Sequence, residues 1–111
     1  MANLILNPQA TMQRSYAAGT DFGNMRQYLE AQVDNPDFDP DATVIAVSIP
    51  DGQSIFCLNA IAGFILEATI LHKDEPWIRD TLLSLFEVDP AELESDIRET
   101  LDNLKSREIL L

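Results

Sequence analysis

Two apolar, β-branched segments lie on either side of a four-residue turn, and this feature constrains the fold most tightly. The segments are Thr43–Ile49 and Ser54–Leu58. Pro50–Gln53 between them supplies the proline, aspartate and glycine that tight turns favour. The pattern predicts an antiparallel β-hairpin. Because an isolated hairpin is only marginally stable in water, this hairpin must pack on other elements of the chain.

Two helices are expected directly after the hairpin. Asn59 is a good N-cap for a helix over Ala60–His72, which is apolar almost all round and should therefore be buried. A second helix should begin at Asp74–Pro76, where an acidic turn carries a proline near the first helical position, and should end by Glu87–Val88.

A third helix has the strongest start signal in the chain. Asp89–Glu92 combines an N-cap aspartate, a proline at the first helical position and a glutamate at the third. The helix should run to about Arg107. Its exposed positions hold six acidic residues against three basic ones. Its apolar residues recur at steps of four, four and three, and these are Leu93, Ile97, Leu101 and Leu104.

The first forty residues carry weaker signals. A third strand should join the hairpin, with Met12–Tyr16 as the candidate and Asn3–Asn7 as its competitor. Asp21–Val33 has helical spacing, and the prolines in Asn35–Pro40 should end that helix. We therefore expect an N-terminal extension over 1–40 and a domain over 41–111. The domain should be α+β and winged helix-turn-helix-like, with a small antiparallel sheet of two or three strands followed by three helices.

Charge and composition exclude several classes of function. Nineteen acidic residues against seven basic ones give a net charge of −12, which repels nucleic-acid phosphate and anionic lipid. One cysteine, Cys57, and one histidine, His72, are too few for a Cys/His zinc site and offer no paired nucleophile and base. We expect neither a metal nor a cofactor, and no catalysis by the chain alone. Met1–Leu6 is too short and lacks the basic start of a signal peptide, which favours the cytosol.

Three segments resemble the PqqD-like family in order and spacing. Phe56–Glu67 is similar to the junction where a family strand ends in Leu-Asn and enters a helix, and Asp80–Val88 is similar to the second helix and its exit. Asp96–Leu110 resembles the closing helix and tail. The sequence departs from the family at His72–Glu75, where the family has Asp-Gly, and at Glu108, where it has glycine.

The resemblance implies a stand-alone recognition protein for a ribosomally made precursor peptide. Such proteins bind the leader of the precursor as a strand added to the sheet, pack it on the closing helix, and present it to a modifying enzyme, often a radical S-adenosylmethionine enzyme. The acidic charge leaves an alternative, an acidic regulatory winged-helix protein that binds a basic protein partner. A homodimer through the same strand would compete with the leader.

Strand addition requires a free sheet edge with side-chain pockets beside it. Either Ile55 and Cys57 or Ser54 and Phe56 should face the helices, and the sequence leaves that choice open. Arg98 and Lys105 would be rim contacts for an acidic leader. The expected leader-binding residues are Ser54, Ile55, Phe56, Cys57, Leu58, Leu93, Ile97, Arg98, Leu101 and Lys105.

Overall fold

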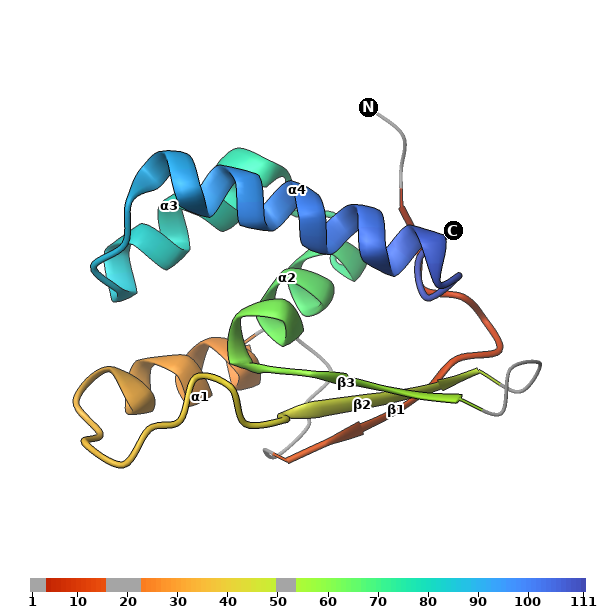
Figure 1. Cartoon of the computed structure of the whole chain (residues 1–111), viewed down its shortest axis with the longest axis horizontal. Coiled ribbons are helices and arrows are strands. Elements are labelled where there is room, and N and C mark those ends of the chain that lie inside the picture. Colours follow the sequence, from red (N-terminus) through yellow and green to blue (C-terminus); the bar gives the residue numbers. More distant parts are fainter. Residues whose placement is uncertain (1–3, 16–22, 50–53) are drawn as a thin grey trace.

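The computed structural model describes residues 4–15, 23–49 and 54–111. These residues form three strands and four helices in the order βαββααα. Figure 1 shows the sheet on one side of the molecule, α2 crossing its inner face, and α3 and α4 beyond α2. The α+β class and the small antiparallel sheet predicted from the sequence are confirmed.

The sheet has the order β1-β2-β3, and both of its pairings are antiparallel. Its strands are β1 (Thr11–Arg14), β2 (Ile45–Ile49) and β3 (Ser54–Leu58). The central strand alternates strictly, with Ile45, Val47 and Ile49 buried and the two residues between them partly exposed. Helices therefore cover one face of the sheet and leave the other face to solvent.

The predicted hairpin is present, and its first strand begins at Ile45 rather than at Thr43. Its turn, 50–53, lies outside the described residues. The third strand lies at Thr11–Arg14, as the candidate Met12–Tyr16 predicted, although Tyr16 is not described.

The competing N-terminal segment pairs with the C-terminal tail instead of the sheet. The backbone N–H of Ile5 donates to the carbonyl of Leu111 at 3.1 Å, and the N–H of Leu111 donates back to Ile5 at 2.9 Å. Leu6 and Leu110 form the bridge between them.

Each of the last three helices begins where the sequence predicts, with Asn59 and Asp89 as the predicted N-caps and Asp74 as the N-cap of the second helix. The side chains of Asn59, Asp74 and Asp89 accept backbone N–H groups at the starts of these helices, each at 2.9 Å. The three helices are α2 (Ala60–Ile70), α3 (Glu75–Leu85) and α4 (Pro90–Ser106).

The first of these helices ends earlier than predicted. Leu71 is the C-cap of α2, and His72 has a φ of 63°, which is incompatible with continuing a right-handed helix. The expected end at His72 was therefore two residues too late.

The core lies around α2, which is buried along most of its length. Phe64, Ile65 and Leu66 are fully buried, so three successive positions around the helix are covered by other elements. Gly63 faces β2 closely: a Cβ there would lie 3.1 Å from the Ile45 side chain and 3.2 Å from Val44. The helix and the sheet thus meet at a glycine, which permits their close approach.

The first forty residues share this core. Helix α1 (Gly23–Val33) contacts α2 and α3, and its Leu29 is fully buried. Strand β1 is linked to α2 by an ion pair in which the Arg14 guanidinium lies 2.7 Å from the Glu67 carboxylate. Glu67 is the only charged residue that is buried in the described part of the chain, so this pair holds the edge of the sheet on the central helix.

Replacement of Leu29 tests whether α1 belongs to the same cooperative unit. Leu29→Ala should lower the free energy of unfolding by ~2–5 kcal/mol, the cost of a cavity at a buried leucine. Val33→Ala, at an exposed position of the same helix, should change it by less than ~1 kcal/mol. Chemical denaturation measures both. Equal effects of the two substitutions would contradict the shared core.

Replacement of Glu67 tests the link between β1 and α2. Glu67→Ala should destabilise the fold by about 2 kcal/mol, less than the ~3–5 kcal/mol of a fully buried pair, because water reaches the partly exposed Arg14. Glu67→Gln retains an acceptor for Arg14 Nε, which bonds Glu67 Oε1 at 2.9 Å, and should cost less. A thermal melt in which both variants match the parent chain would rule out a stabilising role for this pair.

Candidate functional site

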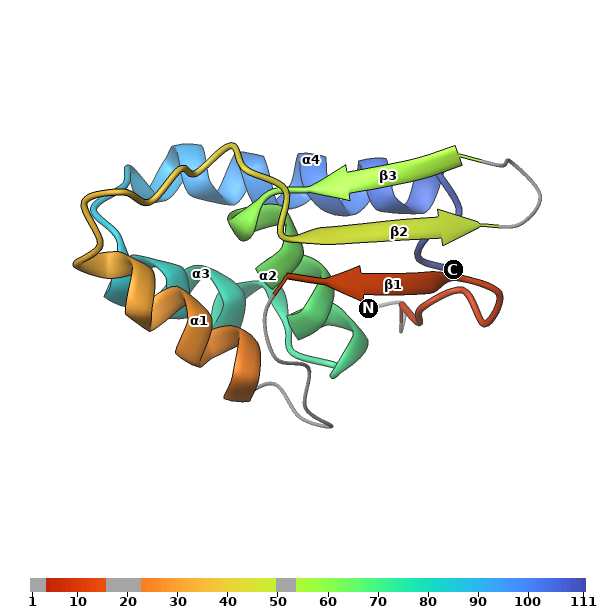
Figure 2. The ribbon, with the colours of Figure 1, turned by 90° about the horizontal axis from the view of Figure 1, so that it is seen from below.

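Strand β3 forms one edge of the sheet, because its only strand partner among the described residues is β2. Figure 2 shows β3 as the outer strand, with β2 between it and β1. An edge strand offers half of its backbone groups to a further strand. The hydrogen bonds of the central strand reveal which half this is.

The backbone of β2 alternates between its two neighbours. Val44, just before the strand, is shared between them: its carbonyl accepts the N–H of Ser15 at 2.9 Å, and its own N–H donates to the carbonyl of Leu58 at 2.8 Å. Counting from the carbonyl that Ser15 uses, Ala46 and Ser48 point their backbone groups toward β1, where Gln13 and Thr11 lie opposite. Ile45, Val47 and Ile49 then point theirs toward β3, where Leu58, Phe56 and Ser54 lie opposite. The N–H and C=O groups of Ile55 and Cys57 are left facing the free edge.

The side chains of β3 settle the choice that the sequence left open. Phe56 and Leu58 are half-buried and pack against the core, whereas Ile55 is 65% exposed and Cys57 is exposed. Ile55 and Cys57 therefore face away from the helices. The side chain of Ser54 lies outside the described residues, although its backbone pairs with Ile49.

Helix α4 lies over the inner face of the sheet, on the side where β3 lies, and runs in the opposite chain direction (Figures 1 and 2). All four of its predicted apolar residues are buried: Leu93 is 5% exposed, Ile97 1%, Leu101 7% and Leu104 2%. They fix the helix on the core. The side-chain surface next to β3 is instead supplied by residues on the flank of the helix.

The cation beside β3 is Arg107, the C-cap of α4. Its guanidinium carbon lies 5.1 Å from the centre of the Phe56 ring, a cation–π contact. This contact joins the end of α4 to the middle of the edge strand. Arg107 is not among the residues predicted for the site, because helical periodicity alone leaves open which flank of the helix faces the strand.

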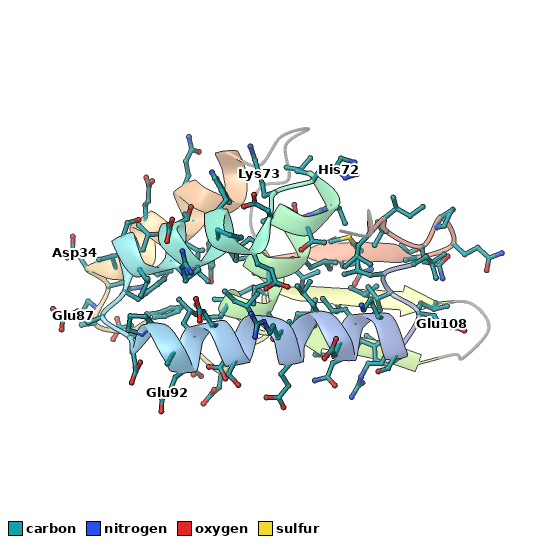
Figure 3. The ribbon with its side chains drawn as sticks, turned by 90° about the horizontal axis from the view of Figure 1, so that it is seen from above. Asp34, His72, Lys73, Glu87, Glu92 and Glu108 are labelled. Carbon is teal, nitrogen blue, oxygen red and sulfur yellow. The ribbon has the colours of Figure 1, made fainter. Side chains whose placement is uncertain are left out.

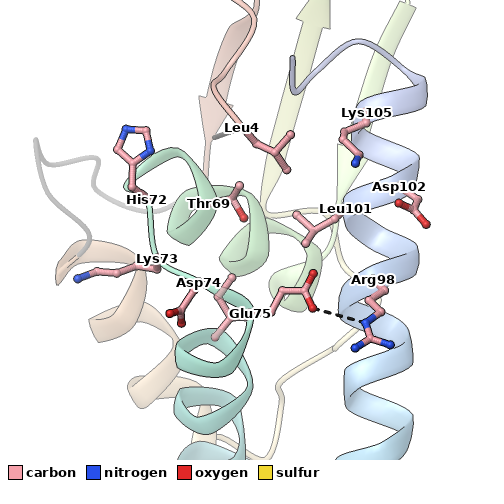
Figure 4. Close-up of a pocket in the computed structure, with 11 residues that line it drawn as sticks. Leu4, Thr69, His72, Lys73, Asp74, Glu75, Arg98, Leu101, Asp102 and Lys105 are labelled. Atoms are coloured by element: carbon pink, nitrogen blue, oxygen red, sulfur yellow. Dashed lines mark ion pairs between the residues drawn. The ribbon is translucent and has the colours of Figure 1, made fainter. Parts of the chain in front are cut away.

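The two basic residues that the sequence did select lie on the other flank of α4. Arg98 and Lys105 line a pocket of about 330 Å³ between α2, α3 and α4, to which His72 and Lys73 also contribute. Figure 4 shows Lys105 pointing into this space, and Arg98 paired with Glu75 at 3.5 Å. Arg107 is nine residues beyond Arg98, which at 100° per residue is half a turn round the helix. The structure therefore does not bring Arg98 and Lys105 together with β3.

The described residues contain no group of three metal-ligating side chains. Cys57 is a free, exposed thiol on the outer face of the sheet, and the arrangement around β3 offers backbone groups and apolar surface rather than a reactive centre. No helix among the described residues is long and apolar enough to cross a membrane. What this arrangement is suited to do is bind an extended chain.

The comparisons with known proteins are independent of this geometry. No curated protein and no solved structure matches the chain, so the winged-helix part of the fold prediction stays a prediction. The family model described as "Coenzyme PQQ synthesis protein D (PqqD)" matches residues 45–110, a span that begins at β2 and includes β3, α2, α3 and α4. This match covers more than half of the chain. The members of the family are accessory or recognition proteins of peptide modification, not catalysts. The chain belongs to the PqqD family.

Proposed function

We propose that this protein binds the leader of a ribosomally synthesised precursor peptide as a fourth strand on β3. In this proposal it presents the attached core of the precursor to a modifying enzyme, which we expect to be a radical S-adenosylmethionine enzyme in the cytosol. Family membership supports a role in peptide modification. The observation that carries the finer proposal is the row of backbone groups that Ile55 and Cys57 direct toward the free edge of the sheet.

The binding energy in this proposal comes from main-chain hydrogen bonds and from apolar contacts on the helix side. Alternate side chains of an added strand would lie over the inner face, next to half-buried Phe56 and Leu58 and to Arg107 at the end of α4. The other side chains would lie beside exposed Ile55 and Cys57 and stay largely in water. Specificity would thus reside in every second residue of the leader.

A second copy of the chain is a competitor for the same edge. Two β3 strands could pair in the way a leader would, and such a homodimer would have to dissociate before the leader binds. The net charge of −12 on each copy opposes this association at low ionic strength. Leader affinity that falls as protein concentration rises would reveal the competition.

The sharpest variant for strand addition is Ile55→Pro. It removes the N–H group that faces the free edge and leaves the groups of Phe56 and Leu58 that face β2, and proline is tolerated at such edge positions. Loss of one main-chain hydrogen bond and of close approach should weaken leader binding roughly tenfold or more. Fluorescence anisotropy with a fluorescently labelled leader peptide measures the change.

Ile55→Ala is the matched control, because it removes the same side chain and retains the N–H group. Its affinity for the leader should stay within about threefold of the parent chain. Circular dichroism and thermal melts of both variants establish that the sheet is intact. A folded Ile55→Pro variant that binds the leader as the parent does would contradict strand addition on β3.

A further inference from the structure

A second pocket of about 330 Å³ lies between the start of α2, which follows β3, and the start of α4. Its apolar lining comes from the loop after α1, from helices α2, α3 and α4, and from the loop that joins α3 to α4. The residues that supply it are Phe38, Ile61, Leu82, Phe86, Val88 and Leu93. Val88 is 45% exposed, so apolar surface remains open to solvent at this site.

The N-terminal segment builds one wall of this pocket. The rings of Phe38 and Phe86 stack with centroids 6.3 Å apart. Phe38 is held by a turn in which its N–H donates to the carbonyl of Asn35 at 3.2 Å, and Pro40 extends the same wall. The pocket therefore depends on residues that precede the segment matched by the family model.

Three carboxylates line the pocket, and no basic residue does. They are Glu87, Glu92 and Asp96, and none of them forms an ion pair with another described residue. The nearby arginines bind other carboxylates: Arg79 pairs with Asp80 and Glu94, and Arg98 pairs with Glu75. Figure 3 shows Glu87 and Glu92 at the end of the molecule where α3 gives way to α4. Glu92 also stabilises the positive end of the α4 dipole. Asp96 lies beyond the first turn and Glu87 lies outside the helix, so the dipole explains neither of them.

We propose that this pocket binds an apolar side chain that is followed or preceded by lysine or arginine, in the leader peptide bound on β3. This inference rests on the proposed function. An apolar cavity with an uncompensated acidic rim is complementary to a cationic, apolar segment and repels an acidic one. At this end of the site the leader should therefore carry a basic residue, which is the opposite of the acidic leader expected from Arg98 and Lys105.

The geometry also gives the spacing within the leader. Asp96 and Arg107 are eleven residues apart, which places them on the same flank of α4 and about 16 Å apart along its axis. An extended peptide covers that distance in about five residues. The cationic residue should therefore lie about five positions from the leader residue that packs beside Phe56 and Arg107.

The first experiment uses two synthetic pentapeptides, acetyl-Ala-Leu-Lys-Leu-Ala-amide and its counterpart with glutamate in place of lysine. Methyl NMR of the full chain should show saturable shifts of Ile61, Val88 and Leu93 with the lysine peptide, and at least about tenfold weaker binding of the glutamate peptide. Neutralising the rim with Glu92→Gln and Asp96→Asn should weaken the lysine peptide about three- to tenfold at low salt. The control pair Glu99→Gln and Asp102→Asn makes the same change in net charge on α4 outside this pocket and should have less effect.

The second experiment separates this inference from the proposed function. The leader itself should shift the same three methyl groups, and its affinity should depend on both the pocket rim and the Ile55 N–H group. A leader that is sensitive to Ile55→Pro but leaves the methyl groups unshifted, or responds equally to the two double variants, overturns the pocket assignment and leaves strand addition standing. A leader that is insensitive to Ile55→Pro overturns the proposed function and, with it, the role of the pocket in leader binding.

Discussion

The burial of α2 is the constraint on which the rest of the structure depends. A helix with Phe64, Ile65 and Leu66 all fully buried must be covered on more than one side. The inner face of the sheet covers one side, with the close approach at Gly63, and α1 and α4 cover others. Helix α3 adds Trp77, whose ring stacks on Phe64 with centroids 6.3 Å apart. The sheet on which α2 packs has three strands in the order β1-β2-β3, so β3 is an edge strand whose outer side is not paired with another strand of the described chain.

The candidate site follows from this arrangement. Helix α4 is held on the core by four buried residues, and its end reaches back to the edge strand through Arg107 and Phe56. The first forty residues contribute Leu29 to the core and Arg14 to the ion pair with Glu67, and Phe38 brings its aromatic ring to the opposite end of α4. A backbone edge, an apolar strand face and an acidic-rimmed pocket are thus placed along one side of the molecule by the same packing that stabilises the fold.

Much of the fold could be predicted from local chemistry. Three helix starts were predicted correctly because Asn59, Asp74 and Asp89 satisfy helical N–H groups within a few residues of themselves. The hairpin was predicted because β-branched runs and turn residues are also local signals. The end of α2 was misjudged because His72 adopts a positive φ, which its sequence neighbours do not reveal.

The site was harder to predict, because its composition depends on tertiary contacts. Which face of β3 packs inward is a matter of register with β2, and a shift of one residue would exchange Phe56 for Ile55. Likewise, Lys105 and Arg107 differ by only two positions but lie on different flanks of α4, and only the packing of α4 decides which of them meets β3. The role of Phe38 depends on a contact with Phe86, 48 positions further along the chain.

Amide hydrogen exchange at β3 tests the central claim most directly. In the free protein the N–H groups of Ile55 and Cys57 face the open edge and should exchange rapidly, whereas those of Phe56 and Leu58 are bonded to β2 and should exchange slowly. Saturation with the leader should slow exchange at Ile55 and Cys57 at least about tenfold, as expected when each gains a main-chain hydrogen bond. A leader that binds tightly and leaves exchange at both residues unchanged would contradict strand addition.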